Sequence, residues 1–327
     1  MKFKIDGFVL SIIAVIGIAY IFPQWGTADS RFPIDTISAI GISLIFFFYG
    51  LKLSPQKLKA GLKNWKLHLL VQASTFLIFP FIVLTFYPLM QNEEQETLWL
   101  AFFFLAALPS TVSSSVVMVS MAKGNIPAAI FNASISGIIG IVLTPIWMGL
   151  FVQNTQADFD FTEIYTKLLL QILVPVFLGL LLQRFLGVLA QKYSSQLSLF
   201  DKSIILLIIY KSFAESFEAK IFGSVSLLDL VMLFIGVLAL FFLVFFSTGI
   251  TAKKLKFNLE DQITAQFCGT KKSLVHGTVF SKILFGKMAS IGIILLPLMI
   301  YHASQILIMS IIAGKLARRK AVGEGSI

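Results

Sequence analysis

The stretch Gln266-Phe267-Cys268-Gly269-Thr270-Lys271-Lys272-Ser273 places two adjacent lysines inside an apolar run that extends from residue 262 to residue 284. One lysine at the centre of a membrane helix costs roughly 2.5–3.5 kcal/mol on insertion scales, so such residues usually line a cavity or a pathway. The glycine ahead of them allows the backbone to open, and the exposed carbonyls can then hold an ammonium group. We therefore expect a helix break at Gly269. The alternative is a lysine pair near the membrane surface whose side chains extend to water.

A second unusual stretch, Leu108-Pro109-Ser110-Thr111-Val112-Ser113-Ser114-Ser115, lies in the apolar run from 97 to 121. Proline removes a backbone donor and clashes with the preceding turn, which predicts a break at Pro109. Five hydroxyl side chains follow within six residues, and they can satisfy freed backbone groups or bind a cation or a polar substrate. The alternative is a proline kink whose serines bond within their own helix.

The whole chain has the composition of a membrane protein. Of its 327 residues, 57% are hydrophobic and 13% are charged, whereas soluble domains have about 45–50% and about 25%. This composition excludes a soluble globular enzyme and a disordered chain. A spanning helix needs about 20 residues, and we predict an all-α polytopic membrane protein with ten transmembrane helices. The predicted spans lie at 7–23, 35–51, 67–90, 97–121, 126–152, 163–185, 203–219, 227–250, 262–284 and 288–313.

Basic residues gather in alternate loops. Of the 26 lysines and arginines, 18 fall on one side of the predicted membrane, among them the cluster 52–66 and the tail 315–320. By the positive-inside rule, this places both termini in the cytoplasm and requires an even number of spans. The rule also explains the net charge of +10, so no nucleic-acid partner is implied. The implied partner is the lipid bilayer of a cell membrane.

The ten spans divide into two halves of five, residues 1–155 and residues 156–327. An odd number of helices per half inserts the second half upside down, which is the inverted-repeat arrangement of many secondary transporters. The two unusual stretches lie in the fourth and the ninth span, roughly 159 residues apart, and such corresponding segments are the best sequence indication of a binding site at the bilayer midplane.

Other polar residues inside apolar runs extend this candidate site. Glu215 has Lys211 four positions earlier on the same helical face, so the pair either neutralises itself or leaves the carboxylate for a substrate or a proton. Four further residues are interpreted as facing the interior of the helix bundle: Gln72, Asn132, Ser134 and Ser136. The three histidines and the single cysteine have no metal-binding spacing. We expect no metal site and no cofactor apart from a coupling ion, Na⁺ or H⁺.

The sequence lacks the patterns of membrane-embedded enzymes and pumps. The zinc-protease pattern H-E-x-x-H, the nucleophile elbow G-x-S-x-G and a glycine-rich phosphate loop do not occur, and no paired carboxylates lie at membrane depth. We therefore predict a protein that handles a small-molecule solute and is not an enzyme.

Together these motifs resemble the bile acid:sodium symporter family over nearly the full length of the chain. The resemblance is carried by Pro109 to Ser115, by Met121-Ala122-Lys123-Gly124-Asn125 and by Phe267-Cys268-Gly269-Thr270-Lys271-Lys272-Ser273-Leu274. The last string is characteristic of the branch around solute carrier family ten, member seven. The resemblance implies an inverted-repeat fold in which a panel of the first, second, sixth and seventh spans faces a core of the other six. The broken fourth and ninth spans then cross near the membrane midplane.

In sodium-coupled members of that family, cations sit behind the crossing. Four residues of this chain match or lie near the positions of their ligands: Gln72, Ser115, Ser134 and Ser136. Elsewhere Val116 stands in place of an asparagine, Phe267 in place of an acid, and Lys271-Lys272 in place of a glutamine-asparagine pair. A lysine ammonium can occupy the place of a cation among oxygens, so we do not expect sodium coupling. A fixed positive charge suits proton coupling, facilitated exchange or direct attraction of an anionic substrate.

The leading hypothesis is a secondary active transporter that moves a small organic solute by alternating access. The charge argument predicts an anionic solute. The polar floor of the cleft between core and panel is expected to contain the following residues, with Glu215 facing it from the panel: Gln72, Ser113, Ser114, Ser115, Thr270, Lys271, Lys272 and Ser273. The alternative is a regulatory membrane protein that affects ion homeostasis, because relatives in the member-seven branch are linked to cellular calcium control.

Overall fold

The computed structural model describes residues 7–26, 32–53, 64–111, 113–152, 166–220, 226–285, 288 and 290–318. Every element within these ranges is helical, which confirms the all-α prediction. In the first half the elements are α1 (Gly7–Ile21), η1 (Pro23–Trp25), α2 (Ile34–Lys52), α4 (Trp65–Ala73), η2 (Ser74–Ile78), α5 (Phe79–Leu84), η3 (Tyr87–Leu89), α6 (Glu93–Ala107), α7 (Ser113–Met121) and α8 (Ile126–Val152). In the second half they are η4 (Leu169–Leu173), α10 (Val174–Lys192), α11 (Ser194–Glu218), α12 (Leu227–Lys254), α13 (Leu259–Thr270), α14 (Leu274–Phe285) and α15 (Ile291–Ala317).

Helices long and apolar enough to cross a membrane recur along the chain, which makes it a multi-pass membrane protein. Six such helices occur in the described residues: Ile34–Lys52, Trp65–Leu89, Ile126–Phe151, Thr166–Lys192, Leu228–Lys254 and Ile291–Ala317. The other four predicted ranges also contain helices, namely α1, α6 with α7, α11, and α13 with α14. That these four also cross the membrane stays a prediction.

Both unusual stretches interrupt their helices. The first break separates α6 from α7 and contains Pro109, as expected. The second break lies at Lys271–Ser273, after α13, so the expectation of a break at Gly269 is wrong. Gly269 is in the last turn of α13 and permits close packing there, because a Cβ atom at this position would lie 3.1 Å from Cβ of Ser74 in η2.

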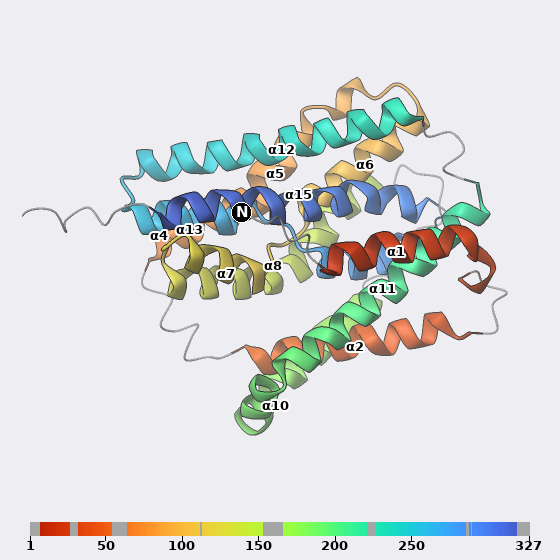
Figure 1. The fold of residues 1–327 in the computed structure, drawn as a ribbon, viewed down its shortest axis with the longest axis horizontal. Coiled ribbons are helices and arrows are strands. Elements are labelled where there is room, and N and C mark those ends of the chain that lie inside the picture. Colours follow the sequence, from red (N-terminus) through yellow and green to blue (C-terminus); the bar gives the residue numbers. More distant parts are fainter. Residues whose placement is uncertain are drawn as a thin grey trace, which may run out of the picture.

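The helices form two packed groups (Figure 1). In one group, α2 packs against α10 and α11, and α1 packs against α11. In the other group, α13 packs against α12 and α4, and α15 packs against α6, α12 and α14. The two groups meet where α11 contacts α14 and α15.

The contact between α2 and α10 depends on two glycines. A Cβ atom on Gly50 would collide with the carbonyl oxygen of Val176, and a Cβ atom on Gly179 would collide with the carbonyl oxygen of Phe47. The two helix backbones therefore touch directly, as membrane helices do where small residues face each other.

We expect Gly179→Ala to destabilise the protein by about 1–3 kcal/mol, because even a methyl group forces these helices apart. The matched control is Gly187→Ala in the same helix, where the three atoms nearest to the added Cβ all belong to the flexible side chain of Gln183. Alanine is a better helix former than glycine, so the control is expected to be neutral or slightly stabilising. Thermal unfolding of the purified protein in detergent measures both, and equal melting temperatures for Gly179→Ala and the unchanged protein contradict the direct backbone contact.

Candidate functional site

Pro109 ends α6 and leaves its last carbonyls without helical partners. Such buried carbonyls need other donors. Thr144 Oγ1 of α8 donates to the Ala107 carbonyl at 2.7 Å. The carbonyls of Ala106 and Leu108 are left for a donor from elsewhere in the fold.

The two breaks are joined by reciprocal hydrogen bonds. The Ser273 N–H donates to the Pro109 carbonyl at 2.9 Å, and Ser110 Oγ donates to the Cys268 carbonyl at 2.8 Å. The N–H of Ser110 donates to Ser136 Oγ of α8 at 2.9 Å. The interrupted segments therefore meet inside the bundle, and we call this meeting point, residues 108–111 and 270–273, the crossing.

Lys272 makes the central interaction of the crossing. Its side chain is fully buried. Nζ donates to three backbone carbonyls, those of Thr75, Ala106 and Leu108, at 2.8, 2.7 and 2.8 Å. The ring of Phe79 lies 4.1 Å from Nζ and adds a cation–π attraction. Three acceptors require three hydrogens, which only the charged ammonium supplies. Lys272 thus places a positive charge among neutral oxygens, as a bound cation would sit.

The Thr75 carbonyl is available to Lys272 because of Pro80. A helix carbonyl accepts from the N–H four residues later, or five residues later in a π-helical turn such as η2. Pro80 follows Phe76 by four residues and Thr75 by five, and it has no N–H to give. Lys272 Nζ bonds to the Thr75 carbonyl instead, and Trp147 Nε1 bonds to the Phe76 carbonyl at 3.0 Å.

Two side chains of α15 fix the backbone of the second break. Gln305 bonds to both backbone groups of Lys272, with Nε2 donating to the carbonyl at 2.8 Å and Oε1 accepting from the N–H at 2.9 Å. The Tyr301 hydroxyl donates to the Thr270 carbonyl at 2.5 Å. Sequence reasoning missed both residues. Gln305 carried the same signal as Gln72, an amide inside an apolar run.

Lys271 differs from its neighbour. Its side chain is also fully buried, but Nζ has no hydrogen-bond partner among the described residues, and neither has Thr270 Oγ1. A buried amine without hydrogen-bond partners costs more free energy than one whose hydrogen bonds are all made. The two lysines are adjacent in the sequence, but burying Lys271 therefore costs more free energy than burying Lys272.

The predicted residues of α4 and α8 form a separate polar cluster. Gln72 Nε2 lies 3.2 Å from both the backbone oxygen and Oδ1 of Asn132, and Asn132 Nδ2 donates to His68 Nδ1 at 2.9 Å. Gln72 Oε1 is buried and has no partner in the described part of the chain.

In the first break, Thr111 Oγ1 shares a hydrogen bond with Ser115 Oγ at 3.0 Å.

A cavity of about 480 Å³ opens beside the crossing, between the two groups of helices. His276 lies in its wall, with Nδ1 bonded to Ser273 Oγ at 2.9 Å and with Nε2 buried and unpartnered among the described residues. Sequence reasoning did not select His276, because an isolated histidine carries no spacing signal. The polar lining consists of Tyr49, Lys52, Thr111, Ser114, Ser134, Ser198, Asp201, Lys202, Ser273, His276 and His302.

Two helices, α7 and α14, have their N-termini at this cavity. α7 begins at Ser113 and α14 at Leu274, and residues from the first turn of each helix line the cavity. Ser273 caps α14, because its Oγ accepts from the His276 N–H at 3.3 Å. Each helix N-terminus carries roughly half a positive charge. Two of them at one cavity favour an anionic group.

Several predicted residues lie outside the cavity, contrary to expectation. Glu215 pairs with Lys211 at 2.6 Å, and Lys211 pairs with Asp35 at 3.1 Å, so the carboxylate does not face a polar floor at the crossing. The side chain of Ser113 lies outside the described part of the structure. Seven further predicted residues are absent from the lining. Gln72 is half-buried, and the other six are buried among the packed helices: Ser115, Asn132, Ser136, Thr270, Lys271 and Lys272. Among the described residues, no three His, Cys, Asp or Glu side chains gather in a way that could hold a metal ion.

Comparison with known proteins gives matches over almost the whole chain. The model of the SBF-like CPA transporter family matches residues 6–318. An uncharacterized protein of Pseudomonas aeruginosa is 36% identical over 98% of this chain and 95% of its own length. The protein named "Putative symporter YfeH" of Escherichia coli (strain K12) is 34% identical over 96% and 94%. "Sodium/bile acid cotransporter 7" of Danio rerio is 32% identical over 94% and 92%.

The same substitution at the two lysines is expected to have opposite effects. Lys272→Met leaves three buried carbonyls without a donor, each costing about 1–3 kcal/mol, so the melting temperature falls strongly. Lys271→Met removes a buried amine that has no hydrogen-bond partner among the described residues and keeps the length of the side chain, so stability is unchanged or raised. Thermal unfolding of both variants in the same detergent measures the difference. A Lys271→Met variant less stable than Lys272→Met contradicts the bonding described for the crossing.

Proposed function

Because the chain belongs to the SBF-like CPA transporter family, we propose that it is a secondary active transporter of the bile acid:sodium symporter type that moves a small organic anion by alternating access. The observation that carries this proposal is the cavity at the crossing, where α7 and α14 begin. The names of two relatives, a symporter and a sodium/bile acid cotransporter, support the same class.

The cavity suits an amphipathic organic anion. Its volume of about 480 Å³ falls within the roughly 300–1,000 Å³ of small-molecule sites. Its charged lining residues in the described part are Lys52, Asp201 and Lys202, and the Lys52–Asp201 pair at 3.5 Å leaves one net positive charge. Apolar side chains such as Phe46 and Leu274 supply the rest of the wall. A carboxylate or sulfonate at the helix N-termini and a hydrocarbon body beside these side chains match this lining.

The proposed transport does not require sodium. Lys272 Nζ occupies three carbonyl oxygens at the crossing, those of Thr75, Ala106 and Leu108, and these are then not available to a sodium ion. The covalently attached ammonium then supplies the positive charge that a co-transported cation supplies elsewhere. Proton coupling and facilitated exchange are both compatible with this arrangement.

Alternating access needs two units that move relative to each other. We propose ten membrane-spanning helices in two inverted halves, 1–155 and 156–327. The helical stretches support this, because each of the five in the first half recurs in the second with an offset of about 160 residues. In this proposal α1, α2, α10 and α11 form the panel, and the remaining helices form the core.

A cluster of four charged residues joins the panel to the core at the end of α2 that lies away from the cavity. Lys282 of α14 pairs with Asp35 of α2 at 2.9 Å, and Asp35 is also bound by Lys211, the partner of Glu215. Asp35 and Lys52 lie at opposite ends of α2, roughly 26 Å apart. The cavity lies at the Lys52 end. With both termini in the cytoplasm of a cell, as the loop charges predict, the charge cluster faces the outside and the cavity faces the inside in the proposed transporter.

The cavity favours transport over a regulatory role in calcium homeostasis. A protein that only binds a partner needs no cavity between two helix groups, whereas a carrier needs one that both groups line. α2 and α11 from the panel and α7, α8 and α14 from the core all contribute to this wall.

Organic anions are expected to bind this cavity better than neutral molecules of the same shape. Cholate should therefore raise the melting temperature of the purified protein more than the amide of cholate does, by the same amount in sodium and potassium buffers. Val275→Trp fills the cavity and should abolish the shift, whereas Val142→Trp, on an exposed face of α8, should keep it. A shift that needs sodium contradicts the sodium-free mechanism. A shift that survives Val275→Trp contradicts the assignment of the site.

Removing the ion pair between core and panel should open the outer end. We expect Lys282→Met to speed the labelling of a cysteine placed at Ser38, which is fully buried one turn inside Asp35. A membrane-impermeant thiol reagent added outside intact cells measures the rate. The control is Lys254→Met at an exposed position of α12. Equal labelling rates in the two variants contradict the role of the charge cluster as the outer closure.

A further inference from the structure

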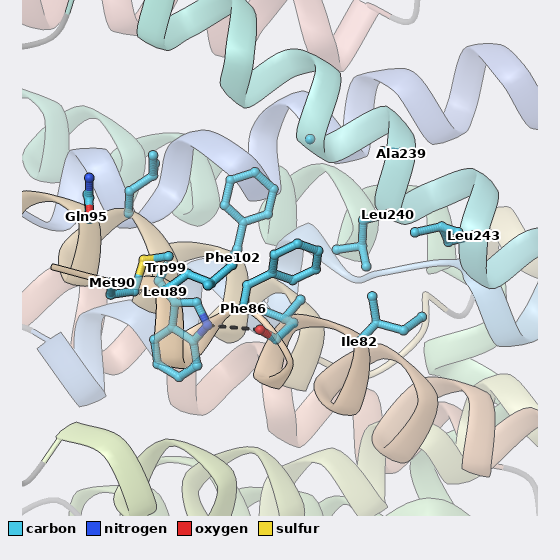
Figure 2. A pocket seen from close by; sticks show the side chains of 13 residues that line it. Ile82, Phe86, Leu89, Met90, Gln95, Trp99, Phe102, Ala239, Leu240 and Leu243 are labelled. Atoms are coloured by element: carbon cyan, nitrogen blue, oxygen red, sulfur yellow. Dashed lines mark hydrogen bonds between the residues drawn. The ribbon is translucent and has the colours of Figure 1, made fainter.

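A second cavity, of about 560 Å³, lies between α5, α6 and α12 and shares no lining residue with the cavity at the crossing. We call it the α12 groove. Figure 2 shows Ile82 and Phe86 on one side, Trp99 and Phe102 of α6 beside them, and Leu240 of α12 across the opening. It is therefore a separate site from the cavity at the crossing.

Two small residues of α12 line the groove where it faces α6. Gly236 has no side chain, and a Cβ atom there would lie 3.0 Å from Cζ of Phe102. Ala239, three residues later on the same face, is exposed and also lines the groove. A larger residue at Gly236 would push the Phe102 ring into the groove, and a larger residue at Ala239 would itself extend into it.

The lining of the α12 groove accepts hydrocarbon and little else. Trp99 has one polar side-chain atom, and its Nε1 already donates to the Val83 carbonyl at 3.0 Å (Figure 2). Gln95 is the other lining residue with a polar side chain, and its Oε1 accepts from the Gln91 N–H at 2.9 Å. A polar solute would leave its own groups unsatisfied here.

The groove opens toward lipid. It lies along two apolar segments long enough to span a membrane, Trp65–Leu89 and Leu228–Lys254. The lining residues Phe86 and Leu243 remain 52% and 55% exposed, so the groove has an open side on the apolar surface. Gln95 marks the end at the membrane surface, because the charged first turn of α6 surrounds it. From Gln95 to Phe102 the groove runs roughly 10 Å inward.

The rim of the groove selects against anionic headgroups. Glu93, Glu94 and Glu96 are all exposed in the first turn of α6, and the sequence has no lysine or arginine between residues 85 and 107. Three carboxylates outweigh the half positive charge of the α6 N-terminus. An ammonium-bearing headgroup is attracted to this rim, whereas a headgroup of net negative charge is repelled.

We propose that the α12 groove is a binding site for one acyl chain of an amine-bearing phospholipid, such as phosphatidylethanolamine, whose ammonium group lies at the glutamate rim. The proposal does not rest on the transport function. It rests on the apolar lining, the small residues that α12 places in that lining and the charge of the rim.

Native mass spectrometry of protein purified from vesicles with equal phosphatidylethanolamine and phosphatidylglycerol tests the proposal. We expect one retained phosphatidylethanolamine, enriched about fivefold over phosphatidylglycerol. Gly236→Leu and Ala239→Leu should each remove the retained lipid; Ala239 is exposed, so its variant keeps the fold even if Gly236→Leu does not. Val231→Phe, at an exposed position of α12 outside the groove, should retain it.

Replacing Glu93, Glu94 and Glu96 with glutamine should keep the bound lipid but equalise the two headgroups. Equal retention of both lipids by the unchanged protein overturns the headgroup assignment. Retention of the lipid by the Ala239→Leu variant, or a dimer mass in place of a lipid adduct, overturns the proposed site.

Discussion

One buried ammonium group, held by three carbonyls from two segments, is the constraint on which the rest of the structure depends. The Thr75 carbonyl is free because Pro80 has no N–H, and those of Ala106 and Leu108 are free because Pro109 ends α6. Each proline creates an acceptor that would be costly if it stayed unbonded, and Lys272 would be costly without acceptors. The ammonium group and the free carbonyls therefore stabilise each other. Removing either one leaves the other buried without a hydrogen-bond partner.

This arrangement separates the charge from the surface that a solute touches. Lys272 lies outside the cavity lining, whereas the first turns of α7 and α14 form part of that lining. The field of a buried charge extends further than in water, because the protein interior screens it less. In the proposed transporter, an anion is thus attracted by the fixed charge and bound by backbone and hydroxyl groups. Its release does not require the ammonium to lose a hydrogen bond.

The sequence predicts the helices and their breaks because these have local causes. Proline and a lysine pair in an apolar run act on their own turn, and the first break falls at Pro109. Contacts between distant segments are different. Tyr301 and Gln305 complete the crossing from α15, more than 30 residues away, and no local pattern points to their partners. Gly269 was misread for the same reason: its effect is to admit Ser74 of η2, and only the tertiary packing reveals that neighbour.

The two adjacent lysines show that the number of charged residues in a motif does not tell which of them takes part in a binding site. Lys271 has an extended backbone, with φ −77° and ψ 146°, and successive side chains on an extended backbone point to opposite sides. Only Lys272 can therefore reach the carbonyls of the crossing, while Lys271 is buried without a partner among the described residues. A motion that brings water or an anion to Lys271 lowers its free energy, whereas a motion that parts Lys272 from its carbonyls raises it. The fourth and ninth predicted spans should therefore move as one body during any conformational change, with Lys271 rather than Lys272 changing its surroundings.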